Sequence, residues 1–430
     1  MQRLHAVDAL RALALLGILA VNIWYFAFPE NLTGAGGARS AGLTSETVGQ
    51  GAGALADHWV VFAVTAIFEG KSYVIFSFLF GLSFVLQWGS AHRAGASEVT
   101  RSVRRFIGLI ILGLLHGIFL FVGDILLAYA LLGFALLGLR RIRARTALLL
   151  AAGLWVAVAL AILGLGMLTL VLESSMTMGE GGGAMDVSML TGSVQEARDA
   201  YTGGLGSYLI FQLSAYVLVA PSTLIVQGPV ALAAFLLGLV LGRGRVLERI
   251  ISGEATTARL LWLMIPTLAV GGALSLTAAW LTWGAPWAPE DSGGPAGGGI
   301  GLETLSAGLI FLAGPLQATG YVVGALLILR HRRFGWLVRA LAPAGRMSLS
   351  NYLGQSLVLA VMFSALGSPV GLGLAGELSA SQVGLVVVVL WAVQLTLSQL
   401  WLRRFARGPV EIPLRAWTYA DPKAQNHPSA

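Results

Sequence analysis

The stretch between Arg104 and Arg145 constrains the fold of this chain more than any other. It reads RRFIGLIILGLLHGIFLFVGDILLAYALLGFALLGLRRIRAR, a long apolar run with arginine clusters at both ends. One straight helix of that length would exceed a hydrocarbon layer of about 30 Å, and a single crossing would place arginines on both sides of the membrane. The sequence therefore predicts a transmembrane hairpin that turns at Gly123–Asp124 on the outer side.

The composition agrees with a membrane protein. Of the 430 residues, 57% are hydrophobic and only 11% are charged, which predicts an all-α, multi-pass integral membrane protein. The net charge of +7 is assigned to arginines that mark cytoplasmic loops, so nucleic acid is not an expected partner. The chain has no cysteine, which excludes disulfides, thiolate nucleophiles and thiolate metal sites.

Apolar runs predict about ten spans, and the basic residues predict their orientation. With both termini inside (N-in/C-in), all basic residues except Arg39, Lys71 and Arg198, or 24 of 27, fall on the cytoplasmic side. Interfacial helices are expected on the outer side at 57–69 and 207–219. The expected spans are 9–28, 71–89, 105–122, 124–139, 147–172, 220–242, 259–283, 303–329, 347–367 and 382–402.

The spans form one membrane domain over 1–430. Within it we distinguish first spans and hairpin (1–145), middle spans (146–345), a C-terminal block (346–419) and a tail (420–430). We expect membrane lipids as partners, and the composition allows a homo-oligomer.

His116 and Asp124 are the expected catalytic residues, since ionisable groups at this depth are costly. His116 lies in the pattern Gly113-Leu-Leu-His-Gly117, whose glycines let a neighbouring helix approach. A neutral imidazole can act as a general base, although an interhelical hydrogen bond would also explain it. Asp124 also suits an ordinary helix cap. About 12 Å of rise would separate the two residues in a continuous helix, so they need not touch.

Three further residues are expected to contact a substrate: Lys71, Tyr129 and Asn22. Lys71 suits an outward-facing anionic group, but snorkelling to the interface would explain it equally. Tyr129 lies five residues into the return helix and narrows the gap between His116 and Asp124. Asn22 shares a helix face with Asp8 and Arg11, and either lines a polar path or hydrogen-bonds a neighbouring helix.

A cytoplasmic cofactor pocket is expected from Asp8, Arg11, Arg346, Asn351 and Gln355. Asp8 and Arg11 are three residues apart on one face of the first span. The ninth span opens GRMSLSNYLGQS, with Ser348, Tyr352, Gln355 and Ser356 at steps of three and four. Interhelical hydrogen bonding is the simpler explanation of any single residue there. No histidines show metal-ligand spacing, so no metal is expected, and no Ser-His-Asp motif of known spacing occurs.

Five sequence blocks together resemble the YeiB-like bacterial family of unknown function. They are VDALRALALLGILAVNI, KSYVIFSFLFG, LLHGIFLFVGDILLAYALLG, GRMSLSNYLGQS and WLRRFARGPVEIPLRAWTY. His116, Gly123, Asp124 and Tyr129 match the family's hairpin; Lys71 matches its second-span block; and Arg346, Asn351, Tyr352 and Gln355 match its late block. The resemblance implies a bacterial plasma (inner) membrane protein. This family is usually grouped with the transmembrane acyltransferase superfamily.

The resemblance implies an enzyme that moves an acyl group from cytoplasmic acyl-CoA to an outward-facing saccharide or lipid-linked acceptor. His116 would take the acceptor's proton or carry the acyl group, and arginines would bind the donor's phosphates. Membrane O-acyltransferases place a histidine where this chain has Asn22, and an amide is no general base, so His116 would have to supply it. The alternatives are a transporter or flippase, with helix breaks at Pro315 and Pro343, and a structural membrane partner.

Overall fold

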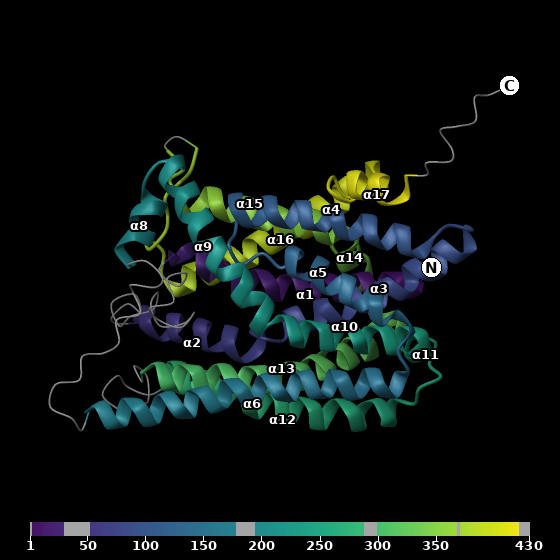
Figure 1. Cartoon of the computed structure of the whole chain (residues 1–430), viewed down its shortest axis with the longest axis horizontal. Coiled ribbons are helices and arrows are strands. Elements are labelled where there is room, and N and C mark those ends of the chain that lie inside the picture. Colours follow the sequence, from purple (N-terminus) through teal and green to yellow (C-terminus); the bar gives the residue numbers. More distant parts are fainter. Residues whose placement is uncertain (1, 30–51, 178–193, 288–298, 368–369, 421–430) are drawn as a thin grey trace.

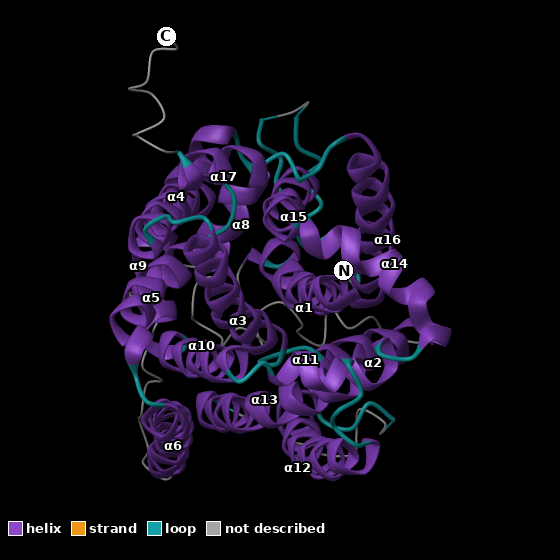
Figure 2. Cartoon of the chain, turned by 90° about the vertical axis from the view of Figure 1, so that its right-hand side faces the viewer, coloured by secondary structure: helices purple, strands orange, loops and turns teal. Residues whose placement is uncertain are grey.

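The computed structural model describes residues 2–29, 52–177, 194–287, 299–367 and 370–420, and this part of the chain contains helices and no strands (Figures 1 and 2). The helices are α1 (Gln2–Ala27), α2 (Ala52–Ile67), α3 (Ser72–Arg93), α4 (Glu98–Phe119), α5 (Leu126–Gly138), α6 (Ala144–Thr177), α8 (Val194–Thr202), α9 (Leu205–Val226), α10 (Gly228–Arg243), α11 (Val246–Ile251), α12 (Thr257–Trp283), α13 (Ile300–Leu329), α14 (Gly335–Arg346), α15 (Ser348–Phe363), α16 (Ala380–Arg404) and α17 (Glu411–Tyr419), with two short 3-10 helices, Leu139–Arg141 and Arg332–Phe334. The expected all-α membrane fold is confirmed.

Eight helical stretches in the described residues are long and apolar enough to cross a membrane. Seven of them coincide with expected spans, and the eighth is α9. The remaining expected spans correspond to α5, α10 and α15, which have only 13, 16 and 16 residues. At 1.5 Å per residue these three helices are about 20–24 Å long, so each crosses only part of the layer.

The helices pack in layers around α1. In its most apolar window 72% of the residues are buried inside the protein, against 11% for α6, so α1 is central and α6 faces lipid. On one side of the molecule α12 packs on α13 and α13 packs on α6 (Figure 1). The end-on view places α1 between that layer and α15, with α4, α5 and α9 on one flank and α14 and α16 on the other (Figure 2).

The arginine-rich connections gather at one end of the molecule. The N-terminus, α11, α14 and α17 lie at this end, which faces the viewer in Figure 2. We call it the arginine-rich end, and the positive-inside rule makes it cytoplasmic. The expected grouping of both termini on one side agrees with this arrangement. The tail from residue 421 onward lies outside the described residues.

Two interruptions divide long helical stretches. Gly70, with φ +78°, separates α2 from α3, and Gln227 separates α9 from α10. The expected interfacial helix at 57–69 is wrong, because α2 packs against α12 and α16 and buries Phe62. The segment 207–219 likewise belongs to the continuous helix α9. Neither proline expected at a break interrupts a helix, since Pro315 lies inside α13 and Pro343 inside α14.

Polar side chains fix several helix starts. Ser97 caps α4 by accepting from the Thr100 amide at 3.2 Å, and Ser379 begins α16 with a capping box. The buried Asp57 of α2 adds a third cap, because its carboxylate accepts from the Ser381 amide at 2.6 Å. This contact ties α2 to the start of α16 and holds α2 in the bundle.

Candidate functional site

His116 lies in the last turn of α4, where close packing depends on two glycines. A Cβ added at Gly113 would lie 2.5 Å from the Leu127 amide nitrogen, and a Cβ at Gly117 would collide with the ring of Tyr216. The glycines therefore allow α5 and α9 to reach the level of the imidazole, as the small-residue pattern predicts.

Asp124 occupies the turn between α4 and α5 and makes two contacts. One oxygen accepts from the Leu127 amide at 2.8 Å, which is the expected cap. The other oxygen lies 2.8 Å from His116 Nδ1. The rise of about 12 Å that a continuous helix would give does not apply, because α4 ends at Phe119 and the chain folds back onto it.

Ser356 completes a line of three polar side chains. Its Oγ lies 2.8 Å from His116 Nε2, although the two residues are 240 positions apart. Because an ionised carboxylate only accepts hydrogen bonds, the proton of a neutral imidazole resides on Nδ1 and Nε2 accepts from the serine hydroxyl. This is the order of contacts in a Ser-His-Asp triad. Sequence spacing could not reveal Ser356, whose only signal was its place on the polar face of the ninth span.

The three side chains Asp124, His116 and Ser356 are shielded from solvent, and two aromatic rings pack beside the imidazole. The side chains of His116 and Asp124 have no exposed surface, and Ser356 is 3% exposed. The ring centroid of Tyr352 lies 4.9 Å from that of the imidazole, and the centroid of Phe121 lies 6.2 Å away. Each of these two rings belongs to the wall of a different cavity.

The first cavity opens at the arginine-rich end and has a volume of about 710 Å³. We call it the arginine cavity. Five arginines and two carboxylates line it: Arg11, Arg105, Arg346, Arg407 and Arg415, with Asp8 and Glu411. Tyr129 and Tyr352 also line it, so the cavity extends to the ring that covers His116.

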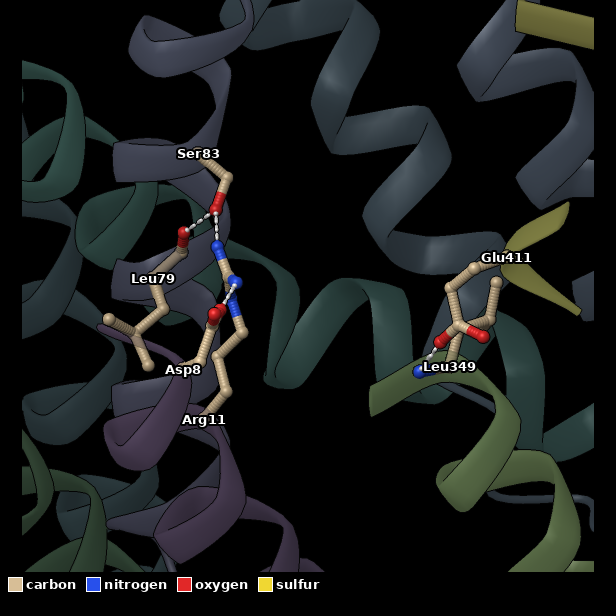
Figure 3. A network of polar contacts seen from close by, with 6 residues as sticks. All are labelled: Asp8, Arg11, Leu79, Ser83, Leu349 and Glu411. Atoms are coloured by element: carbon tan, nitrogen blue, oxygen red, sulfur yellow. Dashed lines mark hydrogen bonds and ion pairs between the residues drawn. The ribbon is translucent and has the colours of Figure 1, made fainter. Parts of the chain in front are cut away.

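Both carboxylates of the arginine cavity are already engaged, as Figure 3 shows. Asp8 pairs with Arg11 at 2.5 Å, and the same guanidinium donates to Ser83 at 2.6 Å. Glu411 accepts from the Leu349 amide at 2.9 Å and so caps α15 from the C-terminal helix. The other four arginines have no carboxylate partner among the described residues, and the wall carries three more positive than negative groups.

Two of the four arginines without a carboxylate, Arg105 and Arg346, are held by weaker contacts. Arg105 donates to Gln87 at 2.9 Å and lies over the Phe80 ring, and Arg346 donates to the Ala406 carbonyl at 2.9 Å. Burial lowers the pKa of Arg407, and the neighbouring Arg415 lowers it further. Cations crowded in this way favour an anionic ligand that would relieve their repulsion.

The second cavity, of about 360 Å³, lies where the two helix interruptions meet. We call it the break cavity. Asn22, Glu69 and Gln227 contribute polar groups to its wall, and Phe121 lines it beside Gly123. His116 lines neither cavity. It lies between them, behind Tyr352 on one side and Phe121 on the other.

Several of the expected site residues line one of these two cavities. Asp8, Arg11, Arg346 and Tyr129 lie in the arginine cavity, and Asn22 lies in the break cavity. Tyr129 is 2.6 Å from Ser77 through its hydroxyl. Sequence reasoning missed Arg105, Arg407 and Arg415 as cavity residues, since the orientation rule alone explains arginines near span ends.

Three expected ligand contacts are structural instead. Asn351 donates to Ser398 at 3.0 Å and Gln355 donates to Gln394 at 2.8 Å, so both join α15 to α16 and line neither cavity. The structure therefore does not bring these two amides together with Asp8, Arg11 and Arg346, the other residues of the expected cofactor pocket. Lys71 is fully buried and donates to the Thr65 carbonyl at 2.9 Å, which contradicts snorkelling and places it in neither cavity wall.

The fold and site define a multi-pass helical membrane protein with a buried acid-base line beside a cationic cavity. Comparison with known proteins then shows what it is similar to. The family described as "Protein of unknown function (DUF418)" matches residues 241–421. The uncharacterized protein YxaH of Bacillus subtilis is 26% identical over 97% of this chain and 94% of its own length, and the uncharacterized protein YeiB of Escherichia coli is 27% identical over 96% and 95%. Over nearly its whole length the chain is similar to these YeiB-like proteins.

Proposed function

We propose that this protein is a membrane acyltransferase. It would move an acyl group from cytoplasmic acyl-CoA to a hydroxyl or amine of a saccharide or lipid-linked acceptor at the opposite face. The observation that carries the proposal is the position of His116, which is oriented by Asp124 and lies between the arginine cavity and the break cavity.

The arginine cavity suits the donor. Acyl-CoA carries several phosphates on a nucleotide and a long thioester arm, and guanidinium groups bind phosphate in bidentate geometry. A volume of about 710 Å³ lies within the range of small-molecule sites. The arm would point along the cavity toward Tyr352, and rotation of that ring would bring the thioester to the imidazole.

The chemistry needs a base and an acid at one position. As the acceptor O–H or N–H attacks the thioester carbonyl, His116 Nε2 takes its proton. The C–S bond then breaks, and the imidazolium returns the proton to the thiolate of coenzyme A. Asp124 holds the proton on Nδ1 and stabilises the imidazolium that forms in between.

One observation favours the alternative of a transporter or flippase. Both helix interruptions, at Gly70 and Gln227, line the break cavity, and transporters commonly build their sites from interrupted helices. A transporter would carry its substrate through unchanged, whereas the acyltransferase would release free coenzyme A.

The test uses purified protein in liposomes of bacterial lipid extract, given radiolabelled acetyl-CoA. We expect thiol release together with transfer of label to the lipid or glycan fraction. Because the chain contains no cysteine, a thiol-reactive dye reports coenzyme A with no background from the protein. Uptake of acetyl-CoA or of labelled lipid without thiol release would contradict the acyltransferase and support the transporter.

Neutralising the cavity arginines should weaken donor binding. Arg105→Gln and Arg346→Gln should each raise the KM for acetyl-CoA about tenfold, because a charge-assisted hydrogen bond contributes about 1.5–3 kcal/mol. The kcat should change much less, since neither residue contacts His116. Arg404→Gln is the control, because Arg404 lies at the end of α16 and lines neither cavity. An equal rise in KM in all three variants would refute specific donor binding here.

A further inference from the structure

We propose that Ser356 is the nucleophile of this site and carries the acyl group as a serine ester between donor and acceptor. This inference rests on the proposed function and adds a covalent intermediate to it. It makes transfer a two-step reaction in which the donor leaves before the acceptor reacts.

The first argument is that the Ser356 hydroxyl is already hydrogen-bonded to the basic nitrogen, Nε2, of His116. Its Oγ is 2.8 Å from Nε2, while Asp124 is 2.8 Å from Nδ1. An external acceptor would have to displace this hydroxyl before it could give its proton to the imidazole. The serine is therefore the first group in line to lose a proton and attack.

The second argument is the direction of the Ser356 hydroxyl. Buried helical serines in this chain commonly donate to the carbonyl four residues earlier, as Ser72, Ser102 and Ser364 do. Ser356 has the same local option with the Tyr352 carbonyl but bonds the imidazole instead. In this orientation Ser356 gives up the hydrogen bond to the Tyr352 carbonyl, and its Oγ is placed to give its proton to His116.

The third argument is a buried donor beside the line. Tyr216 is 4% exposed, and its hydroxyl makes no hydrogen bond with any described residue. Its ring packs against Gly117, directly after His116 in the chain. A buried polar group left without a partner costs about 1–3 kcal/mol, so this phenol is suited to donate to a ligand atom such as a carbonyl oxygen.

The two steps balance as follows. Ser356 Oγ bonds to the thioester carbonyl carbon while its proton passes to His116 Nε2; the C–S bond breaks, and the imidazolium protonates the departing thiolate. In the second step the acceptor hydroxyl or amine gives its proton to Nε2 and attacks the serine ester. The ester C–O bond breaks, and Ser356 regains its proton from His116.

The experiment traps the intermediate by omitting the acceptor. Purified protein in detergent is incubated with radiolabelled acetyl-CoA, quenched in acid and digested, and mass spectrometry locates the acetyl group. We expect label on the α15 peptide, stable to neutral hydroxylamine as an oxygen ester is. Ser356→Ala should lose the label and slow thiol release at least a hundredfold. Ser364→Ala, at the C-cap of the same helix, should keep both.

Ser356→Cys makes the test specific to this atom. The variant would contain the sole thiol of the chain, and its acetyl adduct would be a thioester that neutral hydroxylamine cleaves. Retained label that becomes hydroxylamine-sensitive supports the nucleophile, and it also shows that the variant folds. Loss of label in both Ser356 variants, with a monodisperse elution profile for each and wild-type thiol release by Ser356→Ala, overturns it.

Other outcomes separate this inference from the proposed function. If Ser356→Ala transfers acetyl to an acceptor at the wild-type rate, or if the label resides on His116, the serine ester is refuted and acyl transfer survives. If the wild-type protein releases no thiol from acetyl-CoA in liposomes containing the lipid extract, both proposals fail together.

Discussion

Replacing His116 with glutamine is expected to slow thiol release from acetyl-CoA by about a thousandfold. Glutamine can still hydrogen-bond to Asp124 and Ser356, but its amide cannot accept and return a proton. General acid-base catalysis contributes about 10²–10⁴ in rate, and His116 is placed to act in both directions. The measurement is the initial rate of thiol release by protein in liposomes.

The same experiment can show that His116 and Asp124 act as a unit. Asp124→Asn should also reduce the rate by about 10³–10⁴, because an amide that donates to Nδ1 forces the imidazole proton onto Nε2. The variant with both substitutions should be no slower than His116→Gln alone, since residues that act together are strongly non-additive. His92→Gln is the control, at the exposed end of α3. Losses that multiply, or an unchanged rate in His116→Gln, would contradict the assignment.

The second large effect concerns stability. Gly345 lies where α14 crosses α1, and a Cβ added there would overlap the carbonyl oxygen of Asp8 and lie 2.6 Å from its carbonyl carbon. Backbone atoms cannot rotate away from such a collision, so Gly345→Ala must push the two helices apart. We expect a loss of about 3 kcal/mol or more in stability, at the upper end of overpacking effects. The expected result is a clear fall in the thermal unfolding midpoint in detergent.

Gly354→Ala provides the matched control. Gly354 lies within α15, and a Cβ there would meet nothing within 4 Å. Alanine favours a helix interior by about 1 kcal/mol relative to glycine, so this variant should unfold at the same temperature or slightly higher. Equal midpoints for the two variants would mean that α1 and α14 do not pack as described. Gly345→Ala should also reduce acetyl-CoA binding, because α1 carries Arg11 and α14 carries Arg346.

Much of the site could be predicted from local sequence. The glycines around His116 predicted the close approach of another helix, and Asp124 was recognised as a cap as well as a catalytic candidate. Both features depend on spacing within one short segment, where helix geometry relates sequence directly to position. The pairing of Asp8 with Arg11, three residues apart, was accessible for the same reason.

The sequence could not place a residue whose side chain had two possible directions. Asn351 and Gln355 lie on the polar face of α15, and the sequence could not say whether that face met a cavity or α16. Lys71 was expected to contact a substrate or to snorkel to the interface, and the helix before it was expected to lie on the membrane surface. In the structure α2 enters the bundle instead, so the lysine is buried at the interruption beside Gly70.

By itself the sequence determined the class of protein, the hairpin and the grouping of arginines at one end, and it singled out His116 as a candidate, because hydrophobicity, charge bias and helix period are local properties. Only the tertiary structure decided that Ser356 meets His116, that arginines from several helices surround one cavity, and that two aromatic rings close the imidazole off from both cavities. These contacts join residues as far as 240 positions apart. They depend on which helix faces pack together, and no spacing along the chain encodes that choice.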